Sequence, residues 1–81
     1  MNIAMTLDLP ASTTDAKRKA FYDALTAASF TKISVVTTLW TSTAYATLAG
    51  GQAAVKACGV ATGVTIQKAY LFDYNSWVAL P

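Results

Sequence analysis

The spacing of apolar residues changes along the chain, and the order of these changes restricts the fold more than any other feature. In residues 2–9 the apolar side chains take every second position, which is typical of a β-strand with one buried face. They are Ile3, Met5, Leu7 and Leu9. Pro10 ends this predicted strand, and residues 11–14 form a short polar turn.

A helix is predicted from about residue 14 to residue 28, because the apolar spacing there changes to three and four. The apolar stripe consists of Ala16, Ala20, Phe21, Ala24, Leu25 and Ala28. Ser12, Thr13 and Thr14 are all suitable N-caps, and a following acid suits the first turn. That acid is Asp15, which we expect to pair with Lys19 one turn later.

Residues 30–43 are rich in Ile, Val, Thr and Trp, which favours β-structure. The run is longer than a typical strand of about five or six residues. We therefore expect two strands, roughly 31–36 and 38–43, with a bend or tight turn near residues 36–38. No Gly or Pro marks this break, so one long bent strand is the alternative.

The second helix is predicted to centre on residues 52–58, because Gly50 and Gly51 are poor in a helix interior and Gly59 is a good terminator. Its expected packing face consists of Ala53, Ala54, Ala57 and Cys58. An earlier start is the alternative. Residues 64–74 alternate and predict a strand, residues 75–76 a turn, and residues 77–80 an edge strand or an arm that pairs with a neighbour.

This order of strand, helix, one or two strands, helix and strand describes two βαβ halves joined by a short link. It predicts an α+β fold, a ferredoxin-like βαββαβ sandwich with two helices on one face of an antiparallel sheet. All 81 residues belong to one such domain, because the chain is too short for a second core. The strands are apolar on both sides, so the sheet face away from the helices also needs cover.

The shortage of charge predicts self-association. Hydrophobic residues make up 54% of the chain and charged residues 12%, against about a quarter in ordinary soluble domains. Residues 33–55 carry no charge, but half of them are polar, so we predict no membrane span. We expect a homo-oligomer, a dimer or higher. The N-terminus shows no signal pattern, so we expect a cytoplasmic protein.

The chemical inventory excludes several classes of site within one chain. The sequence has no histidine and a single cysteine, which rules out an internal disulfide, a zinc site and histidine-based catalysis. We interpret Cys58 as a small buried apolar residue. A net charge of +2 is a mild basic bias and falls short of a nucleic-acid footprint.

Several short motifs occur in a familiar order: Leu7-Asp8-Leu9-Pro10, then Asp15-Ala16-Lys17-Arg18-Lys19, then Phe30-Thr31-Lys32-Ile33. This order resembles the CRISPR-associated protein two family. The motifs Thr38-Leu39-Trp40 and Leu71-Phe72-Asp73-Tyr74-Asn75-Ser76-Trp77 look like its short SinR-like and VapD-like relatives. The resemblance implies a ferredoxin-like dimer and, in some members, metal-dependent cleavage of nucleic acid. It carries one functional residue over, Asp8, and the chain lacks the arginine density of the nucleic-acid-binding members.

Asp8 is the strongest candidate for chemistry. Two copies facing each other across a dimer would hold Mg²⁺ through their carboxylates and waters, and the metal would activate water for phosphodiester hydrolysis. The alternative is that Asp8 caps the turn after the first strand by bonding the amides near Ala11 and Ser12.

Two further groups of residues are candidates for binding. Lys17, Arg18 and Lys19 would contact phosphates, or else form a solvated helix face. The aromatic residues would stack on bases, or else anchor an interface or the core, which we favour. They are Trp40, Tyr45, Tyr70, Tyr74 and Trp77.

Two hypotheses of function follow. The first is a non-catalytic, homo-oligomeric interaction protein, a phage or mobile-element accessory that inhibits or sequesters a partner or a nucleotide ligand. The second is a Mg²⁺-dependent nuclease with Asp8 as metal ligand and nucleic acid as substrate. The thin catalytic inventory favours the first, which needs no cofactor.

Overall fold

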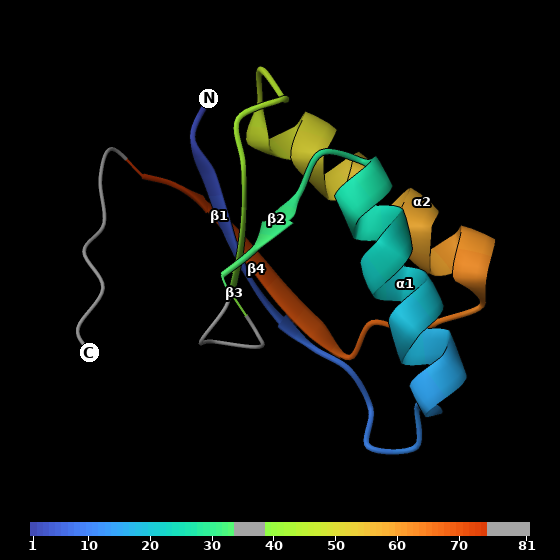
Figure 1. Cartoon of the computed structure of the whole chain (residues 1–81). Coiled ribbons are helices and arrows are strands. Elements are labelled where there is room, and N and C mark those ends of the chain that lie inside the picture. Colours follow the sequence, from blue (N-terminus) through green and yellow to red (C-terminus); the bar gives the residue numbers. More distant parts are fainter. Residues whose placement is uncertain (34–38, 75–81) are drawn as a thin grey trace.

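The structure is a computed structural model that describes residues 1–33 and 39–74 (Figure 1). Two helices and four strands follow one another along this part of the chain. In order they are β1 (Ile3–Asp8), α1 (Asp15–Ala27), β2 (Thr31–Lys32), β3 (Leu39–Ser42), α2 (Leu48–Thr62) and β4 (Lys68–Asp73).

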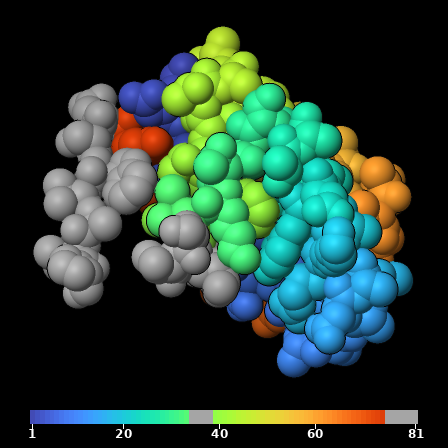
Figure 2. Space-filling view, in the orientation of Figure 1, coloured from blue at the N-terminus to red at the C-terminus, as the bar shows by residue number. Residues whose placement is uncertain are grey.

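The strands form one antiparallel sheet in the order β2-β3-β1-β4, and both helices cover the same face of it (Figure 1). Each helix connects two strands that are separated in the sheet by one other strand. This is the ferredoxin-like α+β arrangement, so the predicted fold class is confirmed. In the space-filling view α1 covers the right of the molecule, and the orange end of α2 shows behind it (Figure 2).

The register of the sheet decides which side chains face the helices. Ile3, Met5 and Leu7 of β1 point into the core, as the alternation predicted, and are at most 5% exposed. Their neighbours Ala4 and Thr6 therefore point to the opposite face.

Both helices end in the same way. Ser29 after α1 and Gly63 after α2 adopt left-handed conformations, with φ of 72° and 68°. The amides of the next residues, Phe30 and Val64, then reach back to the carbonyls of Leu25 and Gly59 at 2.9 and 3.0 Å. This is the Schellman motif, and the residue that follows each turn is buried in the core.

The second helix contains the predicted residues 52–58 and starts earlier, as the alternative predicted, but the prediction that Gly59 ends it is wrong. Gly50, Gly51 and Gly59 all lie inside α2, while Thr47 caps its start by accepting a bond from the Gly50 amide at 3.0 Å. The physical reason is close packing. A Cβ at Gly51 would lie 2.8 Å from Ile3 Cδ1, so the glycine lets α2 approach β1.

The packing faces of the helices also differ from the prediction. In α2 the buried residues are Gly51, Val55, Cys58 and Gly59, whereas Ala53 and Ala57 are exposed and Ala54 is half-buried. In α1 the two large residues Phe21 and Leu25 are buried, while Ala16 and Ala20 are exposed. The large side chains rather than the alanines set the rotation of each helix.

The predicted cap and ion pair of α1 have different outcomes. Thr14 is the N-cap, with Oγ1 accepting from the Lys17 amide at 3.2 Å, and Asp15 lies in the first turn. The predicted pair of Asp15 with Lys19 is wrong, because Lys19 Nζ instead bonds Asp23 Oδ2 at 2.8 Å. That bond raises the pKa of Lys19 above its ordinary value.

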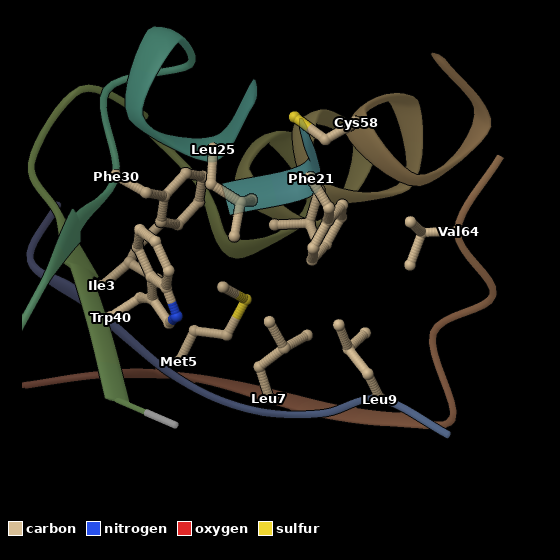
Figure 3. Close-up of a cluster of buried hydrophobic side chains, with 11 residues drawn as sticks. Ile3, Met5, Leu7, Leu9, Phe21, Leu25, Phe30, Trp40, Cys58 and Val64 are labelled. Carbon is tan, nitrogen blue, oxygen red and sulfur yellow. The ribbon is translucent and has the colours of Figure 1, made fainter. Parts of the chain in front are cut away.

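The core is a single cluster between the sheet and the helices (Figure 3). Phe21, Phe30 and Trp40 are its largest members, each at most 1% exposed. Tyr22, which is not part of the predicted apolar stripe of α1, is half-buried and packs on Trp40 with ring centroids 5.3 Å apart. Cys58 is buried as predicted, and burial raises the pKa of its thiol.

Some strand predictions are only partly matched. The last strand is shorter than residues 64–74, because Val64 completes the helix end and pairing as a strand begins at Lys68. The predicted break near residues 36–38, the second half of the predicted strand 31–36, the turn at 75–76 and the arm at 77–80 lie outside the described residues. Within residues 1–33 and 39–74, neither helix is long and apolar enough to cross a membrane.

Candidate functional site

Asp8 ends β1 on the sheet face that the helices leave uncovered. Its pairing partner in β4 is Lys68, and Tyr70 lies two residues further along that strand. These side chains line a shallow hollow of about 230 Å³ with Thr6 and Leu7. Lys68 Nζ lies 5.9 Å from the centroid of the Tyr70 ring, so the cation covers part of the aromatic face.

The surroundings of Asp8 provide little for a metal ion. Within residues 1–33 and 39–74, no three acidic or cysteine side chains gather in one place. The nearest charged group across the strand pair is the cationic Lys68, which disfavours a second cation. The turn after β1 is closed by the Thr13 amide, which donates to the Pro10 carbonyl at 2.9 Å. The alternative role of Asp8 as a cap of this turn does not occur in the described part, where its side chain accepts no bond from the amides of residues 11 and 12.

The three basic residues of α1 lie on the helix layer and do not meet Asp8. Each of them bonds a group of its own chain. Lys17 Nζ donates to the Gly63 carbonyl at 3.3 Å, which ties the start of α1 to the end of α2. Arg18 donates to the Thr13 carbonyl at 3.4 Å, and Lys19 bonds Asp23. The structure therefore does not bring these cations together with the candidate acid.

The aromatic candidates are divided between the core and the surface. Trp40 is 1% exposed, so it packs in the core and offers no ring face to a base. Tyr45 is half-buried, stacks on Phe30 and donates a 2.6 Å bond to the Ala28 carbonyl. Tyr74 is half-buried next to β4, and its amide bonds the Asn2 carbonyl at 3.0 Å. Trp77 lies outside the described residues.

The main surface feature is an exposed aromatic pair on β4, of which sequence reasoning named Tyr70 and missed Phe72. Tyr70 is 59% exposed and Phe72 is 45% exposed. Both point away from the helices, because the intervening Leu71 and Ala69 pack against the core. The signal was present in the alternation of β4, where the bulkier rings share a face with Lys68.

We call the side of the sheet opposite the helices the open face. Its rows follow from the register: Thr31, Thr41, Ala4 and Phe72; Leu39, Thr6 and Tyr70; Asp8 and Lys68. The open face carries one acid and one base and has no net charge, whereas most of the charged residues of the chain lie on the helices. A neutral face of threonines, small aliphatic groups and two rings is suited to contact with another apolar surface.

A second hollow lies between α2 and β4. We call it the β4 groove. It measures about 300 Å³ and is lined by Leu48, Ala49, Gln52, Ala69, Tyr70 and Leu71. On this side β4 is the edge strand of the described sheet.

No protein family, no curated protein and no solved structure matches the chain. The resemblance to the CRISPR-associated protein two family therefore stays a prediction from sequence.

Proposed function

We propose that this chain is a homo-oligomeric interaction protein whose copies contact each other through the open face. The observation that carries the proposal is the exposed pair of Tyr70 and Phe72 in the centre of the described part of β4. Exposed aromatic residues on a sheet face are the residues that most often anchor protein interfaces. The low charge of the whole chain supports the same conclusion.

The chemistry of the open face favours a second copy over nucleic acid. Two neutral faces approach each other without like-charge repulsion, and their rings and aliphatic groups interdigitate as in sheet-on-sheet packing. Nucleic-acid binding depends on several cations near the phosphates. The open face has one cation, Lys68, and its neighbours are Asp8 and Tyr70.

Light scattering tests the proposal. We expect the unmodified chain to have at least twice the monomer mass of 8.5 kDa. The double variant Tyr70→Thr and Phe72→Thr is expected to have a lower mass. Threonine keeps the strand preference but removes the rings. Val60→Thr is the matched control, since Val60 is 84% exposed on α2, far in the fold from the open face. A monomeric unmodified chain, or a mass that the double variant leaves unchanged, contradicts the proposal.

The nuclease hypothesis has weaker support, because only one candidate ligand, Asp8, lies on the open face and Lys68 is paired with it. Cleavage of labelled RNA and DNA with and without Mg²⁺ separates the two functions. We expect no Mg²⁺-dependent cleavage. Cleavage that Asp8→Ala abolishes would replace the interaction proposal with a two-chain metal site.

A further inference from the structure

The outer edge of β4 has backbone groups that the described part of the chain leaves unpaired. Pairing with β1 uses only half of the backbone groups of β4. Because the Tyr74 amide bonds the Asn2 carbonyl, the even-numbered residues of this strand direct their amides and carbonyls toward β1. Ala69, Leu71 and Asp73 therefore direct theirs outward, along an edge with no partner strand in the described part of the chain.

The middle of this edge lacks the features that protect natural edges, whereas charges occur only at its ends, Lys68 and Asp73. Residues 69–72 contain no charge, no proline and no bulge in their pairing with β1. Such an edge is a template for another strand. The opposite edge differs, because β2 has only two residues and one of them is Lys32.

We infer that β4 of one copy pairs antiparallel with β4 of a second copy, centred on Leu71, to form a continuous eight-stranded sheet. This inference rests on the proposed self-association and defines its geometry. The outward amides require that odd-numbered residues face each other, and centring on Leu71 meets this condition. Tyr70 then lies directly opposite the partner's Phe72, which gives two aromatic cross-strand pairs on the open face.

The charges at the two ends of β4 favour this orientation. Lys68 begins the strand and Asp73 ends it, so antiparallel pairing places the basic end of each copy beside the acidic end of the other. The two Lys68 residues are then about six residues apart along the pair, or roughly 20 Å. Lys68 lies on the open face and Asp73 on the helix side, so the pairing forms no ion pair between them. Antiparallel pairing does keep like charges apart by more than the screening length of about 8 Å at physiological salt.

The area of the open face gives an independent argument. Four strands spaced about 4.8 Å apart and up to about 20 Å long cover roughly 300–400 Å². A stable interface buries about 800 Å² on each partner. The open face of one copy is therefore too small for a stable interface. An eight-stranded sheet has twice this area and carries four aromatic rings at its centre. The β4 groove would receive side chains from the same neighbouring copy, next to Leu71.

Amide hydrogen exchange by NMR tests the pairing on the unmodified protein. Amides of residues 70, 72 and 74 face β1 and are protected in any case. We expect the amides of Ala69, Leu71 and Asp73 to exchange at least about a hundredfold more slowly than unpaired amides, and to lose this protection on dilution. Fast exchange at these three positions in a sample shown to be oligomeric overturns the inference. Protection that does not depend on concentration also overturns it, because it indicates pairing within one chain.

Proline substitutions provide the second test. Ala69→Pro removes an outward amide, which an edge strand tolerates, and is expected to halve the mass measured by light scattering. Lys32→Pro is the matched control on the opposite edge, since the bond from the Ile33 amide to the Leu39 carbonyl turns the Lys32 amide outward. Equal masses for the two variants contradict β4 pairing.

The two contacts fail separately. Thr6→Asp separates them, because Thr6 is exposed on the open face in β1 and takes no part in the β4 edge. If the open face is not an interface, Thr6→Asp keeps the unmodified mass while the outward amides stay protected. If the edge is not an interface, those amides exchange fast while Thr6→Asp still lowers the mass.

Discussion

Replacing Gly51 by alanine tests why α2 contains glycines. The added Cβ would lie 2.8 Å from Ile3 Cδ1 and 3.4 Å from Leu71 Cδ2. The first distance is shorter than real Cβ contacts, and Ile3 is fully buried, so its side chain has little room to move. Either α2 moves away from β1 or Ile3 adopts a strained rotamer.

The size of the effect follows from two opposing contributions. Overpacking a core costs about 1–3 kcal/mol. Alanine in place of glycine stabilises a helix interior by about 1 kcal/mol. Gly51→Ala is therefore expected to destabilise the fold by about 1 kcal/mol. Gly50→Ala receives the same helix gain, and its Cβ meets only Thr47 Oγ1 at 3.2 Å and Tyr45 at 3.9 Å.

Urea unfolding followed by circular dichroism measures the difference between these two variants. We expect Gly51→Ala to be less stable than Gly50→Ala by about 1–3 kcal/mol, since the helix contribution cancels. Ile3→Val removes the clashing Cδ1 and should make Gly51→Ala less harmful than it is in the unmodified chain. Equal stability of Gly50→Ala and Gly51→Ala, or no coupling between Gly51 and Ile3, would refute the packing argument.

Three further substitutions test local features. Ser29 has a φ of 72°, which glycine adopts without strain. Ser29→Gly should therefore raise the free energy of unfolding by up to about 1 kcal/mol in a thermal melt. A loss of stability would contradict the Schellman ending. Thr14→Ala removes the cap of α1 and should cost about 1 kcal/mol, with Thr13→Ala as the nearby control that leaves stability within about 0.5 kcal/mol. Burial raises the pKa of Cys58 above its ordinary value of 9.0, so the folded state keeps a proton that the unfolded state loses. The free energy of unfolding should therefore fall as the pH rises past about 9. The urea midpoints at about pH 8 and pH 10 should differ less in Cys58→Ala than in the unmodified chain. An equal difference in both chains would show that another group titrates.

The elements with regular periodicity were predictable. The alternation of residues 2–9 identified β1 and its buried face, and the spacing of Phe21 and Leu25 identified α1, with Thr14 as one of three candidate caps. These signals are local, so a single sequence contains them.

The extent of α2 was not predictable, because tertiary packing outweighs helix propensity there. A glycine costs a helix about 1 kcal/mol wherever it occurs. Only the structure shows that Gly51 faces Ile3 and that Gly59 lies against the Val64 carbonyl. The alanine faces were misassigned for a related reason, since alanine fits both buried and exposed positions.

The candidate site was also predictable only in part. The end of β1 at Asp8 and the exposure of the sheet were accessible from sequence, because alternation places these residues on one face. The pairing of Asp8 with Lys68 and the burial of Trp40 depend on the register between distant strands, which the sequence alone does not specify.

The open face as the contact between copies is tested most directly by an isotope-filtered nuclear Overhauser experiment. Labelled and unlabelled chains are mixed in equal amounts, so that only contacts between copies give cross-peaks. We predict cross-peaks from the ring protons of Tyr70 and Phe72 to protons of the partner. Cross-peaks confined to residues of the helix layer such as Val60, or a mixture that gives none, would contradict the account.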